Sequence, residues 1–240
     1  MTKALCGALW DDVWISREVR FLRIEFLGGS SEVGASCTLY QSDGTNILID
    51  AGIRMGSEAA TGLPGDALPD LARISDVGHL DAILVTHAHM DHIGALPLVH
   101  QAFPRTPIYA TAPTVELMQV LLADALRIMA VKAEQEAEIP LYDPATVGSM
   151  FARIQPVHFG QGTIELPSRT KLSFHPAGHI LGAALVEIQG QESNLLVSGD
   201  FSVTDQRTVA GMVLPRTKPD VLITESTYGN RLHSNRAAEE

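Results

Sequence analysis

Short apolar runs alternate with glycine-rich breaks in the first part of the chain, and this pattern predicts β-strands. The runs Phe21–Leu27, Ala35–Gln41 and Asn46–Asp50 are separated by a Gly-Gly-Ser-Ser break and by a turn with an Asp-Gly pair. The segment Leu80–Thr86 is apolar at nearly every position, which is typical of a strand that is covered on both faces.

The middle of the chain changes to a helical period. Pro113–Ala137 carries apolar residues three and four positions apart, and Pro113 with Thr114 marks its start. Shorter helices are predicted at Ile93–Ala102 and Pro144–Ile154. Further strand-like runs then follow at Lys171–His175, Ala183–Ile188, Asn194–Ser198 and Val221–Thr224. This order of strands, helices and strands predicts a layered α/β fold around a mixed sheet.

Composition and charge narrow the function classes. The 240 residues include 17 Lys and Arg against 28 Asp and Glu, which gives a net charge of −11. This acidic balance argues against nucleic-acid binding through a general basic surface, unless bound metal ions supply positive charge locally. No apolar stretch reaches the roughly 18 residues of a membrane span. Cys6 and Cys37 cannot form a disulfide framework, and no secretion signal precedes the fold, so we predict a cytoplasmic protein.

The segment Thr86-His87-Ala88-His89-Met90-Asp91-His92 carries the clearest chemistry. It places four potential metal ligands directly after a buried strand. Neutral imidazoles with carboxylates suit Zn²⁺, and suit Mn²⁺ or Fe²⁺ less well. Four ligands this close together cannot all converge on one tetrahedral ion, so we expect two ions.

Three other strand ends supply further candidates, two after the histidine segment and one before it. His179 lies in a turn between Gly178 and Gly182, and Asp200 follows an apolar strand and a glycine. Beside the histidine cluster, both are predicted metal ligands. Asp50, which ends the run at residues 47–49, is a candidate for the carboxylate that orients a ligating histidine.

These motifs resemble the metallo-β-lactamase fold superfamily, whose H-x-H-x-D-H signature matches residues 87–92. Three further segments resemble its β-CASP branch, which includes RNA 3′-end processing endonucleases and bacterial ribonucleases. These segments are residues 27–34, the turn at residues 177–183 and the stretch Glu225-Ser226-Thr227-Tyr228-Gly229-Asn230-Arg231. The resemblance implies a four-layer αββα sandwich, with residues 21–224 as the metallo-β-lactamase-like domain and residues 1–20 as an N-terminal extension.

The resemblance also implies roles for individual residues. It assigns one zinc to His87, His89 and His179, a second zinc to Asp91 and His92, and a bridging position to Asp200. Asp50, Asp91 and Glu225 are the implied catalytic residues. In the family, Glu225 holds a histidine that acts as general acid.

The family takes that histidine, and one further zinc ligand, from a segment well beyond Glu225. The chain has no matching segment before Glu240. We therefore expect residues 225–240 to begin a truncated β-CASP-like region, the fold to be incomplete at its C-terminus and any homodimer to form through the missing part.

The predicted function is zinc-dependent cleavage of phosphodiester bonds in single-stranded RNA, with low activity in these 240 residues. Two alternatives stay open. The first is a small-molecule metallohydrolase of the same superfamily that acts on a thioester, lactam or ester. The second is a non-catalytic scaffold with a degenerate site.

Overall fold

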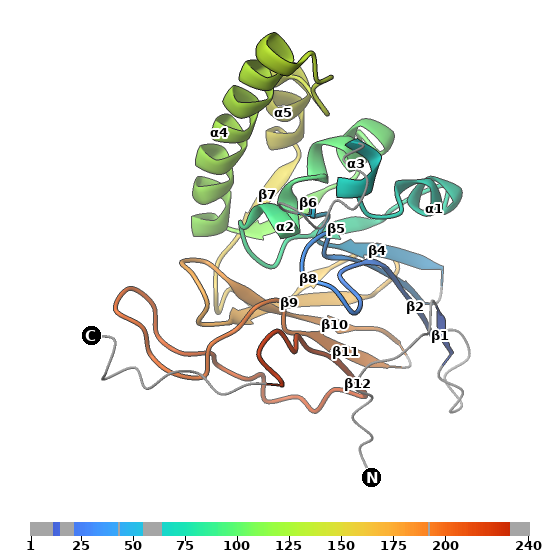
Figure 1. Cartoon of the computed structure of the whole chain (residues 1–240). Coiled ribbons are helices and arrows are strands. Elements are labelled where there is room, and N and C mark those ends of the chain that lie inside the picture. The colour runs from blue at the N-terminus through green and yellow to red at the C-terminus, as the bar shows by residue number, and fades with distance from the viewer. Residues whose placement is uncertain (1–11, 15–21, 43, 55–63, 192, 231–240) are drawn as a thin grey trace.

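Two β-sheets and a set of helices make up the computed structural model, which describes residues 12–14, 22–42, 44–54, 64–191 and 193–230 (Figure 1). The first sheet has seven strands in chain order, antiparallel from β1 to β4 and parallel from β4 to β7. Its strands are β1 (Asp12–Trp14), β2 (Leu22–Gly28), β3 (Cys37–Ser42), β4 (Thr45–Ile49), β5 (Ala82–Leu84), β6 (Ile108–Thr111) and β7 (Ile154–Val157).

The second sheet has five strands in the order β12-β11-β10-β9-β8. Only β11 and β12 run parallel to each other. The strands are β8 (Ile164–Glu165), β9 (Lys171–Pro176), β10 (Ala184–Gln189), β11 (Asn194–Val197) and β12 (Val221–Ile223). The amide of Ala184 donates to the carbonyl of Thr86 at 2.9 Å, which ties the second sheet to the segment that follows β5.

The helices gather on one side of the first sheet, and the second sheet lies on its other side (Figure 1). They are α1 (Leu71–Asp76), α2 (Met90–Ile93), α3 (Leu96–Ala102), α4 (Ala112–Glu136) and α5 (Pro144–Phe151), with a 3₁₀ turn, η2, at Pro64–Ala67. The longest, α4, starts where the Thr111 hydroxyl accepts from the Thr114 amide. Within the described residues, no helix is long and apolar enough to cross a bilayer.

Two apolar layers hold this arrangement together. Leu39, Leu48 and Ile83 pack on the helix side of the first sheet, with Met118 and Leu122 of α4. Their neighbours in the strands, such as Tyr40 and Ile47, point the other way and fill the space between the sheets, together with Phe174 and Val186 of the second sheet. Strands buried on both faces explain why the runs in this part of the sequence are apolar at consecutive positions.

The layered α/β fold predicted from the sequence is confirmed, and the differences are local. Ile93–Ala102 is the end of α2 followed by α3, and the four-residue strands β6 and β7 were not expected because each is too short to show a period. Within the predicted N-terminal extension, residues 12–14 pair with β2 as an edge strand. The rest of that extension and residues 231–240 lie outside the described residues. Among the described helices, none lies on the outer face of the second sheet (Figure 1), so the fourth layer stays a prediction.

Candidate metal centre

The predicted site residues lie at strand ends on one edge of the two sheets. Asp50 follows β4 and the His87–His92 segment follows β5, in the first sheet. His179 lies in the turn between β9 and β10, and Asp200 follows β11, in the second sheet. Since the carboxyl ends of neighbouring parallel strands share an edge, residues far apart in the sequence meet there.

The His87–His92 segment changes from strand to helix within the motif. The chain does not stay extended as far as Asp91, because α2 begins at Met90. Two backbone hydrogen bonds fix this helix: the Ser36 amide donates to the Asp91 carbonyl at 2.9 Å, and the Ala51 amide donates to the His92 carbonyl at 2.8 Å. A Cβ atom on Gly52 would lie 1.6 Å from the Asp91 carbonyl oxygen, so only glycine allows this approach.

Three imidazole nitrogens converge on one point. The distance from His87 Nε2 to His89 Nδ1 is 3.1 Å, and that from His89 Nδ1 to His179 Nε2 is 3.2 Å. Asp200 Oδ2 completes the group, at 3.9 Å from His87 Nε2 and 3.6 Å from His179 Nε2. All four ligand atoms lie within 4.8 Å of one another.

This geometry fits a bound cation better than a hydrogen-bond network. His89 Nδ1 carries at most one proton and therefore donates to at most one of its two neighbouring nitrogens. The remaining lone pairs face one another, which is unfavourable without a cation between them. In a tetrahedral zinc site with Zn–N distances of about 2.0–2.1 Å, ligand nitrogens are about 3.3 Å apart, close to the spacing observed.

A second set of ligand atoms lies on the other side of Asp200. Its Oδ1 is 3.5 Å from His92 Nε2, which in turn is 3.9 Å from Asp91 Oδ2. The two carboxylate oxygens of Asp200 therefore face different histidines: Oδ2 faces His87 and His179, and Oδ1 faces His92.

Asp50 orients His92 from behind and does not face the ligand sets. It is buried, and its Oδ2 lies 2.7 Å from His92 Nδ1 and 2.7 Å from the Thr86 hydroxyl, while its Oδ1 accepts from the Thr86 amide at 2.8 Å. Because the carboxylate accepts the Nδ1 proton, the opposite nitrogen, Nε2, is directed at Asp91 and Asp200. Thr86, whose role the sequence did not reveal, also lies 3.1 Å from His87 Nδ1.

The electrostatics of the cluster favour cation binding. Burial lowers the pKa of His87 well below its usual value, and the neighbouring His92 and His89 rings lower it further. Burial and His179 also lower the pKa of His89. Both rings are therefore neutral at pH 7, as metal ligands must be. Burial would raise the pKa of Asp200, but its contacts with His92 outweigh this and lower that pKa, so the carboxylate is ionised.

His92 has the opposite tendency. Burial opposes a charge on this ring, but the carboxylates of Asp50 and Asp200 outweigh burial and raise the pKa of His92 to about 10. Without a bound metal ion, the His92 ring thus carries a positive charge between the carboxylates of Asp50 and Asp200. A cation bound at Nε2 would take over that role.

Glu225 lies next to this centre, at the end of β12. Its Oε1 accepts from the Phe201 amide at 3.2 Å, and its own amide donates to the Ser198 hydroxyl at 3.2 Å. The carboxylate is therefore fixed to the residue that immediately follows Asp200.

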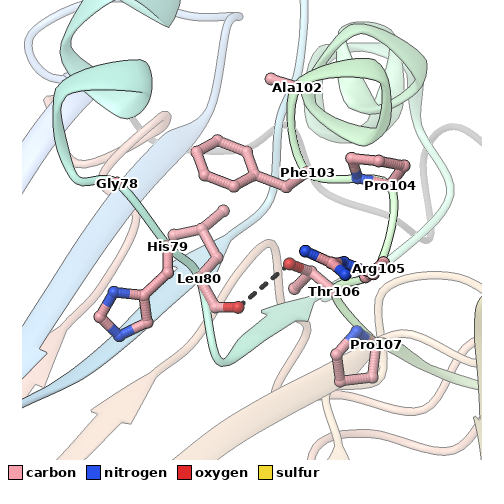
Figure 2. Close-up of a pocket in the computed structure, with 9 residues that line it drawn as sticks. All are labelled: Gly78, His79, Leu80, Ala102, Phe103, Pro104, Arg105, Thr106 and Pro107. Carbon is pink, nitrogen blue, oxygen red and sulfur yellow. Dashed lines mark hydrogen bonds between the residues drawn. The ribbon is translucent and has the colours of Figure 1, made fainter.

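A separate surface pocket of about 290 Å³ lies at the opposite ends of the strands (Figure 2). Its lining comes from the segments before β5 and β6, with His79 on one side, Pro104 and Pro107 on the other, and Leu80 between His79 and the ring of Phe103. The ligand sets follow β5 and this pocket precedes it, so the pocket is not part of the metal centre.

Comparison with known proteins agrees with this architecture. A family model described as the metallo-beta-lactamase superfamily domain matches residues 39–226, more than half of the chain. A solved structure of a protein of unknown function from Enterococcus faecalis V583 matches with a TM-score of 0.55 and 16% identity, over 76% of this chain and 44% of that one. At that identity, the likeness concerns the fold alone.

Two curated relatives are more similar in sequence. The chain is 36% identical over 215 residues to the endoribonuclease ysh1 of Schizosaccharomyces pombe, which covers 89% of this chain and 27% of that protein. It is 35% identical over 211 residues to the transcription termination factor FttA of Methanocaldococcus jannaschii, which covers 87% of this chain and 32% of that protein. The chain thus spans about a third or less of each relative. Since the matched region, residues 39–226, includes strands β4 to β12 and every predicted ligand, the chain belongs to the metallo-beta-lactamase superfamily.

Proposed function

We propose that the chain is a zinc-dependent hydrolase that cleaves phosphodiester bonds in single-stranded RNA, as a ribonuclease of the β-CASP type. The observation that carries this proposal is the position of Asp200, whose two oxygens each face a different set of imidazole nitrogens. The similarity to a protein named as an endoribonuclease supports RNA as the substrate.

The ligand assignment follows the two sets. His87, His89 and His179 would hold the first zinc, His92 and Asp91 the second, and Asp200 would contribute one oxygen to each. Two ions held in this way would lower the pKa of a water molecule to about 7 and would offset negative charge on the phosphoryl oxygens. Zinc suits the imidazole-rich first set best, and Mn²⁺ or Fe²⁺ are the less favoured alternatives.

The other residues position the groups that act. Asp50 keeps the proton of His92 on Nδ1, so that Nε2 stays available as a ligand. Asp91 is half-buried, and its carboxylate lies on the solvent-facing side of the second ligand set, 3.9 Å from His92 Nε2. The leaving 3′-oxygen of RNA requires a proton, and general-acid help of this kind is worth about 10²–10⁴ in rate.

Glu225 is the proposed anchor of that proton donor. One of its oxygens accepts from the Phe201 amide, and the other would accept a hydrogen bond from a donor outside the described residues. In the proposed domain organisation, residues 21–224 form the metallo-beta-lactamase domain and residues 225–240 begin a β-CASP-like region. Low activity of these 240 residues would follow from incomplete general-acid catalysis.

The small-molecule alternative is less favoured. A lactamase or thioesterase would have no use for an acidic anchor at Glu225, and neither curated relative is named for small-molecule hydrolysis. The degenerate-scaffold alternative is disfavoured because each proposed ligand position holds a residue that can bind zinc.

Cytoplasmic location and homodimer formation are the remaining parts of the proposal. The buried free thiol of Cys37 is compatible with a reducing compartment. Residues beyond those described would form the dimer contact.

Cleavage of labelled single-stranded RNA by excess zinc-loaded chain tests the proposal, because a single turnover makes a slow reaction measurable. We expect products with a 5′-phosphate, and we expect cleavage to persist when the 2′-hydroxyl at the cleaved bond is replaced by hydrogen. Products with a 2′,3′-cyclic phosphate, or no cleavage above a chelator-treated sample, would contradict the proposal.

Two variants complete the test. Asp91→Ala should abolish cleavage and leave the fold intact, because Asp91 is half-buried and the hydrogen bond that its carbonyl accepts from the Ser36 amide does not depend on the side chain. Asp81→Asn is the matched control, since Asp81 accepts from the Asn46 amide at 2.8 Å before β5, at the far end of the strand. Faster hydrolysis of a lactam or thioester panel than of RNA would favour the small-molecule alternative.

A further inference from the structure

The turn that carries His179 is shaped by glycines and held at both ends. The Ala177 amide donates to the Ala183 carbonyl at 2.8 Å, which closes the turn between β9 and β10. Gly178 and Gly182 both have positive φ angles, of 75° and 82°. At the far end, the hydroxyls of Thr111 and Thr114 donate to the Gly182 carbonyl at 2.6 and 3.0 Å. The threonine pair at the start of α4 thus fixes the Gly182 end of the turn.

The near end of the turn, where His179 lies, has a different partner. The side-chain amide of Gln206 donates to the carbonyl of Gly178 at 2.9 Å and to the carbonyl of His179 at 3.0 Å. An amide nitrogen has two N–H groups, and this contact uses both of them. One side chain therefore bridges two consecutive carbonyls, and these belong to the proposed ligand and to the residue before it.

Gln206 is held in place by a closed loop that begins next to Asp200. The Met212 amide donates to the Ser202 carbonyl at 2.8 Å and closes the loop at its base, and the Ser202 amide donates to the Ala177 carbonyl at 2.9 Å. The backbone amide of Gln206 donates to the Val209 carbonyl at 2.8 Å, within the loop. The loop therefore reaches the His179 turn both through backbone at its base and through a side chain at its tip.

The close approach of this loop depends on Gly178. A Cβ atom at that position would lie 2.6 Å from the Met212 nitrogen and 2.6 Å from the Ser202 carbonyl oxygen. Gly178 thus lets the loop pack directly on the turn, within reach of the Gln206 side chain. The loop begins next to Asp200, and its Gln206 side chain contacts the His179 carbonyl. It therefore connects two proposed ligands of the first set, Asp200 and His179.

We infer that Gln206 is a positioning residue for the metal centre: it fixes the backbone of His179 so that Nε2 stays directed at the other ligands. This inference rests on the proposed metal site. Residues that orient ligands from outside the coordination sphere typically change metal affinity by about 10–100-fold when they are mutated. Without Gln206, the turn keeps its threonine contacts at Gly182 but loses both contacts at the His179 end.

Zinc competition against a chelator of known affinity, with the full 240-residue chain, tests this inference. We expect Gln206→Ala to weaken the first zinc by about 10–100-fold. Gln206→Glu should weaken it at least as much, because a carboxylate of the same length would repel both carbonyls. Gln161→Ala is the control, since Gln161 is also exposed and its side chain also contacts backbone, accepting from the His158 amide within its own turn at 2.9 Å, far from His179 in the sequence.

Two further measurements separate positioning from a general loss of stability. The unfolding midpoint of Gln206→Ala in chelator should match that of the parent chain, because Gln206 is exposed and outside both apolar layers. The visible absorption of the Co²⁺-loaded variant should differ from that of the parent chain, since these bands report the arrangement of the ligands.

The outcomes are distinguishable. If the parent chain binds no zinc, the proposed function fails. If the parent binds zinc and both Gln206 variants keep its affinity and its Co²⁺ spectrum, the proposed function stands and the positioning role is overturned. An affinity loss equal to that of Gln161→Ala, or a loss that only follows a lower unfolding midpoint, also overturns it.

Discussion

Asp50→Asn is the sharpest perturbation that the centre offers, because it changes the proton on a ligand without changing the shape of the side chain. Asp50 Oδ2 lies 2.7 Å from His92 Nδ1, whereas Oδ1 accepts from the Thr86 amide at 2.8 Å. Asparagine keeps the contact with the Thr86 backbone amide through its oxygen. It places an NH₂ group against His92 and the Thr86 hydroxyl. The imidazole must then accept at Nδ1 and carry its proton on Nε2, the nitrogen needed for metal.

The size of this effect follows from the bond that is lost. A hydrogen bond to a charged group contributes about 1.5–3 kcal/mol, which corresponds to a factor of about 10–150 in an equilibrium constant. We therefore expect Asp50→Asn to weaken the proposed second zinc by roughly one to two powers of ten, while the proposed first zinc, whose ligand set does not include His92, should keep its affinity. The fold should lose about 1–3 kcal/mol of stability from the buried mismatch at the Thr86 hydroxyl.

Equilibrium dialysis followed by elemental analysis measures this change. At a free zinc concentration that saturates both sites of the parent chain, the variant should hold one equivalent in place of two. Nitrogen chemical shifts of the histidine rings would report the change of tautomer at His92 directly. Asp81→Asn serves as control and should bind like the parent. Two equivalents of unchanged affinity in Asp50→Asn would refute the argument that Asp50 directs Nε2.

Three other predictions are independent of that one. Asp200→Ala should lose both zinc equivalents in the same dialysis assay, because its oxygens face both ligand sets. Chelation should lower the unfolding midpoint by about 5–10 °C in calorimetry, since a ligand at 100 times its dissociation constant adds about 2.7 kcal/mol. Burial would raise the pKa of Glu187, but hydrogen bonds from Thr217, Gln189 and His175 outweigh it and lower that pKa below 4.5. The stabilisation by Glu187 is therefore present above pH 4.5 and is lost as the pH falls through the folded-state pKa. Glu187→Gln should remove that part of the acid sensitivity in urea titrations, and an unchanged pH profile would contradict it.

The sequence was sufficient for those parts of the site that have a dense local pattern. The His87–His92 motif could be found because four potential ligands in six residues have no ordinary packing explanation. His179 and Asp200 could be found because each follows an apolar run with a glycine beside it. Their positions in the structure agree with these predictions, although ligation by each residue stays a prediction.

The remaining parts depend on contacts between distant segments. Thr86 precedes the motif, but its contact with Asp50 arises only when β4 and β5 lie side by side. Gln206 is a polar residue in a polar loop, and no local signal distinguishes it from Gln161. The strands β6 and β7 are equally hidden, since four residues do not establish an alternation. Such features come from tertiary packing, which a single sequence does not display.

The wide spacing of the ligands along the chain has a consequence for biosynthesis. The proposed ligands His87 and Asp200 are 113 positions apart, and both sheets must dock before Asp200 faces His87 and His92. A nascent chain emerging from the ribosome therefore cannot complete the proposed metal site until β11 and Asp200 have been released. Until then, the free histidines of the first half are exposed to adventitious metals, so maturation depends on folding being faster than that capture.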